Sequence, residues 1–216
     1  MADSRSSPSI AAGEVHVWLG ASVSGSEETI RTLLADYVGC VPRRLEIDRV
    51  AGRPALGVAM GSDLSFNLAH SQDLGVLAVT RDARVGVDVE RLRSGLSVDA
   101  LAQRFFAASE ADAIAALPKS DRTSAFFRTW VRKEAYLKAV DAGVGVPAGL
   151  RRFAVSVTAS DALIRSTELE PGGVSAFSLY DLDVPDGYVG ALAVEGTGHR
   201  IRYFDRSHVE GEGGQG

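Results

Sequence analysis

Two segments of the chain place charged side chains at the spacings of a strand and a helix: Gly86-Val87-Asp88-Val89-Glu90 and Trp130-Val131-Arg132-Lys133-Glu134-Ala135-Tyr136-Leu137-Lys138. The first segment predicts a strand. Side chains two apart on a strand share a face, so Asp88 and Glu90 point the same way. The second predicts a helix, and residues four apart on a helix share a face. Trp130, Glu134 and Lys138 therefore form one line.

If the two elements pack together, three carboxylates meet beside an ammonium. Three oxygen ligands suit a hard divalent cation such as Mg²⁺, which binds substrate phosphates, so Asp88, Glu90 and Glu134 are the predicted metal ligands. Lys138 lies one turn beyond Glu134 and suits an anionic leaving group. Each pattern alone is commonplace. A half-buried strand often carries such a pair of carboxylates on its solvated face. Glu134 and Lys138 could be an ordinary i,i+4 surface ion pair, which contributes only about 0.2–0.5 kcal/mol. Their combination predicts chemistry at a phosphate.

Composition narrows the class of protein. The chain has 216 residues, 45% of them hydrophobic, which suffices for one large domain or two small lobes. Its net charge of −5 excludes a general nucleic-acid binder that acts by bulk electrostatics. An acidic partner would therefore need a local basic patch.

The single cysteine, Cys40, allows no intrachain disulfide, which fits a reducing cytosol and predicts a cytoplasmic protein. Cys40 has no evident catalytic partner. The N-terminus lacks the apolar core of a signal peptide, and no apolar run is long enough to span a membrane. We therefore expect neither a membrane nor a nucleic acid among the partners.

Hydrophobic periodicity predicts a mixture of strands and helices. Predicted strands cover residues 14–20, 45–50, 64–69, 74–80, 84–90, 153–158, 174–181, 188–195 and 200–204, and predicted helices cover 26–38, 97–105, 109–117 and 121–140. The short turns between 64 and 90 predict an antiparallel meander. Ser109 and Asp112 are spaced as a capping box. Residues 1–13 and 207–216 are predicted to be disordered.

One short internal similarity stands out. Residues 74–79 align with 189–194, and each segment follows a Phe-x-Leu strand, at 66–68 and 177–179. Two buried strands can converge on the same apolar residues. Alternatively, the chain contains two similar α+β lobes, residues 14–92 and 93–206, with a site in the cleft between them.

The combined motif closely resembles the signature of the 4'-phosphopantetheinyl transferases. That signature is Gly-x-Asp-x-Glu followed, about forty residues later, by Trp-x-x-Lys-Glu-Ala-x-x-Lys. Further similarities favour the surfactin-type branch: Gly52-Arg53-Pro54, Phe66-Asn67-Leu68-Ala69-His70-Ser71, and Arg104-Phe105-Phe106 followed by Glu110. The resemblance extends over most of the chain, from about residue 30 to residue 204.

The resemblance implies a fold and a reaction. The implied fold is α+β, with two similar lobes related by a pseudo-twofold axis and mostly antiparallel sheets. The implied reaction transfers the 4'-phosphopantetheine group of coenzyme A to a serine of an apo acyl or peptidyl carrier protein and releases 3',5'-ADP. Mg²⁺ is the implied metal, with Mn²⁺ as a substitute. A chain that holds both lobes would be a monomer.

The resemblance also assigns roles to residues. Asp88, Glu90 and Glu134 would hold Mg²⁺ against the diphosphate of coenzyme A. Glu134 is the candidate general base, directly or through a water. Lys138 would bind coenzyme A and stabilise or protonate the departing 3',5'-ADP. Trp130 is expected to pack in the core.

Other residues are implied in substrate binding. Arg53 and His70 would grip phosphates, although a structural role is the default for a lone histidine. Lys133 would contact the phosphate–pantetheine region. Carrier docking is assigned to the arginines near the two signature segments: Arg91, Arg93, Arg128 and Arg132. Ordinary solvated surface charge is the alternative for each of them.

The chain departs from the family pattern in two places. Ala69 stands where the family usually has Ser, so a hydroxyl donor near the phosphates is missing, at a cost of about 1 kcal/mol. A basic helical stretch between the first strand and first helix also has no counterpart. These departures motivate a second hypothesis, a carrier-binding homologue with little turnover. A third is an unrelated magnesium-dependent phosphohydrolase.

Overall fold

The computed structural model describes residues 9–21, 23, 27–50, 53–56, 63–140, 149–158 and 162–205. The predicted disordered ends, 1–13 and 207–216, lie outside these residues except for 9–13, where Ile10 is buried in a hydrophobic cluster. Residues 141–148, which follow the signature helix, also lie outside the described part.

The described elements alternate along the chain. The helices are α2 (Glu27–Val38), α3 (Val98–Phe105), α4 (Ala108–Ala115) and α5 (Lys119–Val140). The strands are β1 (Glu14–Gly20), β2 (Ile47–Val50), β3 (Arg53–Leu56), β4 (Leu64–Ser71), β5 (Leu74–Arg81), β6 (Val85–Arg91), β7 (Phe153–Val155), β8 (Ile164–Thr167), β9 (Phe177–Asp181), β10 (Tyr188–Glu195) and β11 (Arg200–Asp205).

The strands form two main sheets. One is four-stranded, in the order β11-β1-β5-β4, and the other is three-stranded, in the order β6-β10-β9. All pairings in them are antiparallel except that of β1 with β11. Two small hairpins, β2-β3 and β7-β8, complete the described sheets. The predicted mixed α+β class with mostly antiparallel sheets is confirmed.

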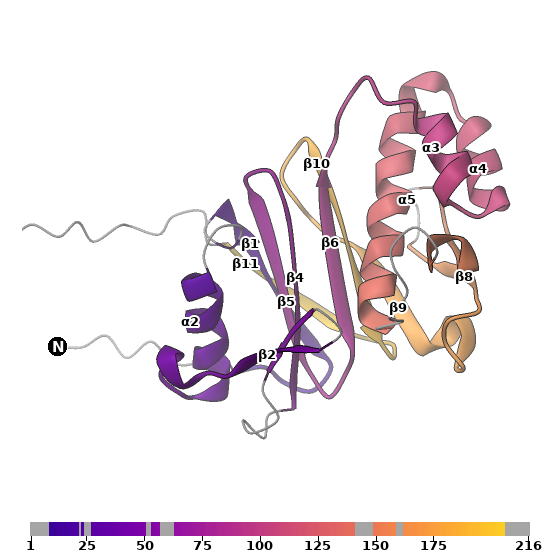
Figure 1. Ribbon diagram of the computed structural model, residues 1–216. Helices are drawn as coiled ribbons and strands as arrows, with labels where there is room; N and C mark the ends of the chain where they lie inside the picture. The colour runs from indigo at the N-terminus through magenta and orange to yellow at the C-terminus, as the bar shows by residue number, and fades with distance from the viewer. Residues whose placement is uncertain are drawn as a thin grey trace, which may run out of the picture.

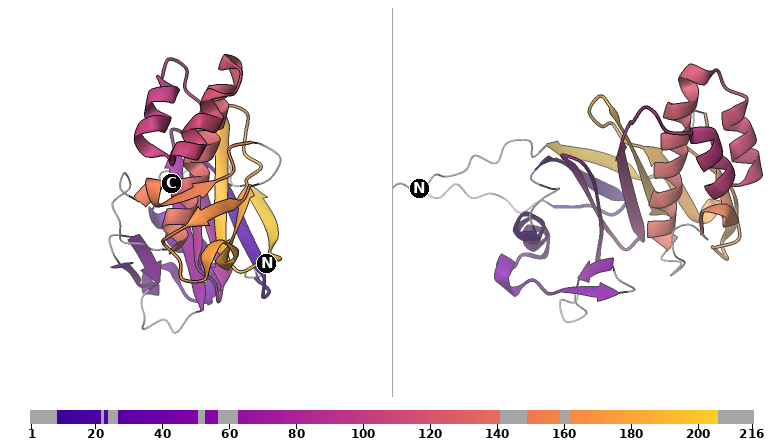
Figure 2. Two further views of the ribbon diagram at one scale, coloured as in Figure 1. Left: turned by 90° about the vertical axis from the view of Figure 1, so that its right-hand side faces the viewer. Right: turned by 45° about the horizontal axis from the view of Figure 1, so that its top comes forward.

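The two main sheets stack face to face between helices, as Figure 1 shows. Val17 of β1, Val76 of β5 and Val87 of β6 share the core between the sheets with Leu192 of β10. Helix α2 covers the outer face of the four-stranded sheet, and α5 covers the outer face of the three-stranded sheet. The right-hand view in Figure 2 shows the same order, with α3 and α4 packed beside α5.

The predicted meander is only half correct. Strands β4 and β5 pair as expected, whereas β6 joins β10 in the other sheet. Both edges of β5 are occupied, by β1 and by β4. Strand β6 therefore packs Val85, Val87 and Val89 against the four-stranded sheet and turns the intervening residues toward α5. Conversely, β11 comes from the C-terminal part of the chain and joins the four-stranded sheet, where it pairs in parallel with β1. The predicted lobes, 14–92 and 93–206, therefore do not coincide with the sheets.

The helix starts follow local chemistry. Helix α3 begins after Ser97, as predicted, although the Ser97 hydroxyl makes no capping bond. The capping box predicted from Ser109 and Asp112 is wrong. The N-cap is Ala107, and its N–H donates to Glu110 Oε2 at 2.9 Å. No helix in the described residues is both long and apolar enough to cross a membrane.

The internal similarity corresponds to strands β5 and β10, each paired with a Phe-x-Leu strand, but its alignment is out of register. Leu68 lies opposite Leu77, whereas Leu192 lies opposite Tyr180. Leu77 consequently packs toward α2, while Leu192 packs between the sheets. A shift of one residue turns a strand's side chains to the other face.

Candidate active site

Strand β6 and helix α5 approach each other closely at Gly86. A Cβ built on Gly86 would lie 2.1 Å from Ala135 O and 2.5 Å from Ala139 N, which are backbone atoms of α5. Only glycine fits such a contact. Because Asp88 and Glu90 share a strand face with Gly86, they face the same helix.

Lys138 joins the two elements directly. Its Nζ donates to the backbone O of Val87 and to Asp88 Oδ1, each at 2.9 Å. Both side chains are largely buried, with 22% of Lys138 and 12% of Asp88 exposed. This charge-assisted contact confirms that the signature strand and helix meet.

Asp88 keeps one oxygen for another partner. Its Oδ2 is buried and has no hydrogen-bond partner among the described residues. Burial is the main cause that raises the pKa of Asp88 to about 6; Lys138 opposes this shift, and the nearby Glu90 carboxylate adds to it. An unpartnered buried carboxylate oxygen is costly, and such atoms mark places where an ion or ligand binds.

Glu90 lies at the end of β6 and is held from strand β4. The Ser71 hydroxyl donates to Glu90 Oε2 at 2.8 Å and accepts the Arg91 N–H at 3.1 Å. Arg93 approaches the same Oε2 at 3.6 Å. Asp88 and Glu90 thus lie on one strand face. The Lys138 ammonium binds Asp88, and the Ser71 hydroxyl binds Glu90.

Glu134 lies one turn before Lys138 on α5 and is 8% exposed. Among the described residues, however, no three His, Cys, Asp or Glu side chains are grouped so as to hold a metal ion. The metal site expected from Asp88, Glu90 and Glu134 therefore stays a prediction.

An apolar pocket of about 240 Å³ opens beside Glu90. Its lining is mainly aromatic and aliphatic, with Glu90 and Arg93 as its charged members: Glu90, Arg93, Leu96, Leu101, Phe105, Phe126, Phe127 and Trp130. Trp130 packs edge-on against Phe105, with ring centroids 5.9 Å apart. The prediction that Trp130 is a packing residue agrees with this position, and its ring also lines the pocket.

Lys133 is not at the site, which corrects its predicted contact with the phosphate–pantetheine region. Its side chain is fully buried, and Nζ lies 2.8 and 2.7 Å from the two carboxylate oxygens of Glu110 and 2.7 Å from Phe153 O. Burial lowers the pKa of Lys133 to about 8, opposed by Glu110. A substrate phosphate has no access to this ammonium.

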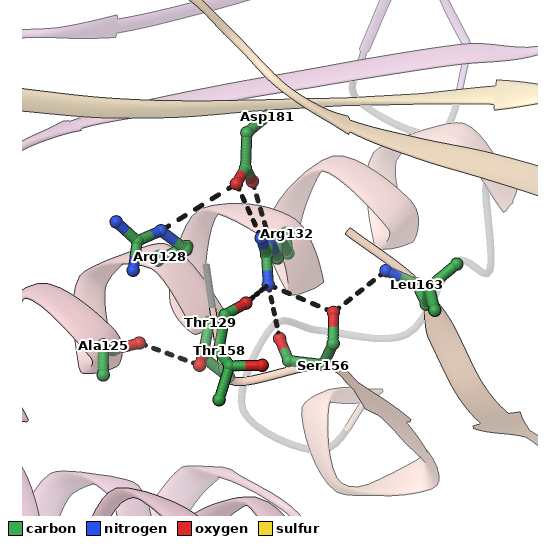
Figure 3. A network of polar contacts seen from close by, with 8 residues as sticks. All are labelled: Ala125, Arg128, Thr129, Arg132, Ser156, Thr158, Leu163 and Asp181. Atoms are coloured by element: carbon green, nitrogen blue, oxygen red, sulfur yellow. Dashed lines mark hydrogen bonds and ion pairs between the residues drawn. The ribbon is translucent and has the colours of Figure 1, made fainter. Parts of the chain in front are cut away.

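Arg132 is also a core residue and not a docking residue. Figure 3 shows its guanidinium bound to both oxygens of Asp181, at 2.8 and 2.6 Å, and to Ser156 O at 2.6 Å. The Arg132 side chain is completely buried. Arg128 lies nearer the surface, 25% exposed and 3.9 Å from Asp181.

The other predicted binding residues lie around the carboxylate site of β6 and α5. Arg91 and Arg93 are exposed at the end of β6, and the Arg93 guanidinium lies over the Phe127 ring at 5.6 Å. His70 is exposed on β4, on the face opposite Ser71. Arg53 begins β3, and its side chain lies outside the described part.

Comparison with known proteins identifies the group to which this arrangement belongs. Residues 84–193 match the model of the 4'-phosphopantetheinyl transferase superfamily. The chain is 34% identical over 177 residues to the 4'-phosphopantetheinyl transferase HetI of Nostoc sp., covering 81% of this chain and 71% of HetI. The chain belongs to the 4'-phosphopantetheinyl transferase superfamily. It is therefore an enzyme of that transferase type, and the predicted family is confirmed.

Two further relatives carry the name of the same transferase. The chain is 25% identical over 182 residues to the 4'-phosphopantetheinyl transferase Sfp of Bacillus subtilis, covering 74% of this chain and 78% of Sfp. It is 33% identical over 124 residues to the putative 4'-phosphopantetheinyl transferase slr0495 of Synechocystis sp., covering 57% of this chain and 50% of that protein. The superfamily match contains both β6 and α5.

Sequence reasoning missed several residues that shape this transferase site. Ser71, Glu110 and Gly86 belong to the family-like motifs, but the sequence pattern assigned no role to any of the three. Strand alternation could have placed Ser71 on the face of Asn67, whose Oδ1 accepts the Val87 N–H at 3.0 Å. A glycine inside a predicted strand is a sign of close backbone approach, and this signal was available at Gly86.

Proposed function

We propose that this transferase moves the 4'-phosphopantetheine group of coenzyme A to a serine of an apo carrier protein and releases 3',5'-ADP. The observation that carries the proposal is the 2.9 Å contact of Lys138 with Asp88, which puts a cation from α5 on the carboxylate face of β6. Glu134 and Glu90 lie on the same two elements. Carboxylates beside a lysine suit transfer of a phosphoryl-linked group.

Magnesium is part of the proposal. The residues fit it in two respects: the donors are all carboxylates, and Asp88 Oδ2 is buried without a partner in the described part of the chain. Asp88, Glu90 and Glu134 would hold the ion, and Mn²⁺ would substitute for it. When bound, the metal neutralises charge on the diphosphate.

The chemistry requires one bond to form and one to break. The carrier serine Oγ attacks the phosphorus next to the pantetheine, and the bond from that phosphorus to 3',5'-ADP breaks. Glu134, directly or through a water, takes the serine proton. Lys138 balances the charge that develops on the leaving 3',5'-ADP.

Residues around the carboxylate site are candidates for binding the two substrates. The pocket beside Glu90 offers apolar surface to the uncharged part of the pantetheine arm. His70 and Arg53 are proposed for the phosphates of coenzyme A. Arg91, Arg93 and Arg128 are proposed for the acidic carrier, because all three are near the end of β6 or on α5.

The finer assignments rest on the surfactin-type resemblance. The carrier would come from polyketide or nonribosomal peptide synthesis. The protein would be a cytoplasmic monomer, and its two lobes would be related by a pseudo-twofold axis. For the last of these, the support is that each main sheet carries a helix on its outer face and contains a Phe-x-Leu hairpin.

Intact-mass analysis tests the proposal. An apo carrier protein is incubated with this chain, coenzyme A and Mg²⁺. The expected result is conversion to the phosphopantetheinylated mass, which EDTA prevents. Absence of any mass shift across several unrelated carriers, with folded protein, would contradict transfer.

One second candidate is a carrier-binding homologue with little turnover, which Ala69 and the missing basic stretch between the first strand and the first helix motivate. In that case the chain would bind a carrier without modifying it. Coenzyme A hydrolysis without any carrier would instead indicate a phosphohydrolase.

A further inference from the structure

Strand β6 is an edge strand of its own sheet, and β4 covers its free edge with side chains. Among the described strands, β6 pairs only with β10. On its other side, the Val87 N–H donates to Asn67 Oδ1 at 3.0 Å, and the Arg91 N–H donates to Ser71 Oγ at 3.1 Å. Two side chains from one face of β4 thus replace ladder bonds at the two ends of the signature strand.

The bond from Arg91 fixes the direction of the Ser71 proton. A serine hydroxyl has one hydrogen to donate and lone pairs to accept with. Because the Arg91 N–H can only donate, it occupies a lone pair of Ser71 Oγ. The single hydroxyl hydrogen is then directed to Glu90 Oε2, which lies 2.8 Å away.

Ser71 consequently constrains which Glu90 oxygen faces a ligand. Both contacts to Glu90 from the described residues, from Ser71 and from Arg93 at 3.6 Å, are made to Oε2. Glu90 is thereby oriented by β4, a strand that belongs to the other sheet.

We propose that Ser71 is a positioning residue for Glu90, which it orients as a ligand for a divalent cation. The proposal rests on the metal-dependent function proposed above. In this role Ser71 acts through Glu90. A partner of this kind typically changes metal affinity about 10- to 100-fold when it is removed.

The test is Mn²⁺ binding to the full chain without coenzyme A, followed by the electron paramagnetic resonance signal of free Mn²⁺. Ser71→Ala is expected to raise the dissociation constant about 10- to 100-fold, while Ser71→Thr, which keeps the hydroxyl, restores it. Ser65→Ala is the matched control, because Ser65 lies on the same face of β4 opposite Thr80. It should bind Mn²⁺ like the wild type.

Two further variants keep the test decisive. Glu90→Gln gives the loss expected when the ligand itself is removed. If Ser71→Ala does not fold, as thermal unfolding would show, Ser71→Cys carries the test because a thiol of similar size is a weak donor.

The outcomes separate this proposal from the proposed function. Transfer by the wild type, with Ser71→Ala binding Mn²⁺ as tightly as Ser65→Ala, would overturn the role of Ser71 and leave the function intact. A wild-type chain that neither binds Mn²⁺ nor modifies a carrier would overturn both.

Discussion

The ammonium of Lys133 lies 2.7 and 2.8 Å from the two carboxylate oxygens of Glu110, and both side chains are almost completely buried. Glu110 also accepts the N–H groups of Val155 and Ala107, at 2.7 and 2.9 Å. One buried acid thereby ties α4, α5 and β7 together. Lys133 is adjacent to Glu134 in the sequence, but its side chain stabilises the core.

We expect Lys133→Met to destabilise the fold by about 3–5 kcal/mol, because Glu110 would be left as an uncompensated buried charge. Urea unfolding measures the change, and a double-mutant cycle with Glu110→Gln isolates the pair. If Lys133 contacted coenzyme A instead, the variant would show normal stability and a raised KM for coenzyme A.

Gly86→Ala should separate β6 from α5. The added methyl would meet backbone atoms of α5 at 2.1 and 2.5 Å, and backbone cannot yield as a side-chain end can. Overpacking of this kind costs about 1–3 kcal/mol or more, and the displaced helix would move Lys138 away from Asp88. We expect at least a hundredfold loss of kcat/KM, about 2.7 kcal/mol, in the carrier-modification assay.

Gly190→Ala is the control for the glycine substitution. Its Cβ would lie 3.1 Å from a Val184 methyl, the nearest atom, and that side chain can shift. It should retain most activity and stability. Equal losses in the two variants would contradict a specific role for the β6–α5 approach.

Asp88→Asn should remove stabilisation by magnesium. A ligand that binds only the folded state raises the unfolding free energy by about 2.7 kcal/mol at one hundred times its dissociation constant. The melting temperature of the wild type should therefore rise with MgCl₂, and that of Asp88→Asn should not. NaCl at matched ionic strength is the control, and an equal rise in both proteins would remove Asp88 from the ligand set.

Glu134→Gln tests the proposed base. The amide keeps the size of the side chain but cannot take the serine proton, so kcat should fall about 10²- to 10⁴-fold. Circular dichroism and urea unfolding should show an intact fold. Near-normal turnover would remove Glu134 from both its base and its metal role.

His16 should make stability depend on pH. It is 1% exposed, and its Nδ1 lies 2.7 Å from the Tyr37 hydroxyl. Burial lowers the pKa of His16 below its ordinary 6.5, an effect that contact with Glu14 opposes. Below pH 6.5 the unfolded chain therefore binds a proton that the folded chain does not, and the unfolding free energy falls as the pH falls.

His16→Asn should flatten this dependence, because an amide stays neutral throughout. The slope attributable to one proton is at most about 1.4 kcal/mol per pH unit. Urea unfolding between pH 7 and pH 5 measures it. Identical slopes in the variant and the wild type would show that His16 does not couple folding to pH.

The sequence predicted the elements well because their signals are local. Helix α5 was expected over 121–140 and spans Lys119–Val140, and the strand predicted at 188–195 is β10. Partner choice was harder. The short turn before β6 favoured pairing with β5, but both edges of β5 are occupied by β1 and β4, and the β1 pairing joins segments about sixty residues apart, which no local pattern reveals.

The sequence by itself determined the class, the family and the face on which Asp88, Glu90, Glu134 and Lys138 lie, because spacing along a strand or helix fixes direction. Only the tertiary structure decided where the neighbouring charges went. Lys133 and Arg132 share the signature helix with Glu134, yet they are buried against Glu110 and Asp181. These partners lie far away in the sequence, and no local pattern reveals which side of a mostly buried helix meets the substrate and which meets the core.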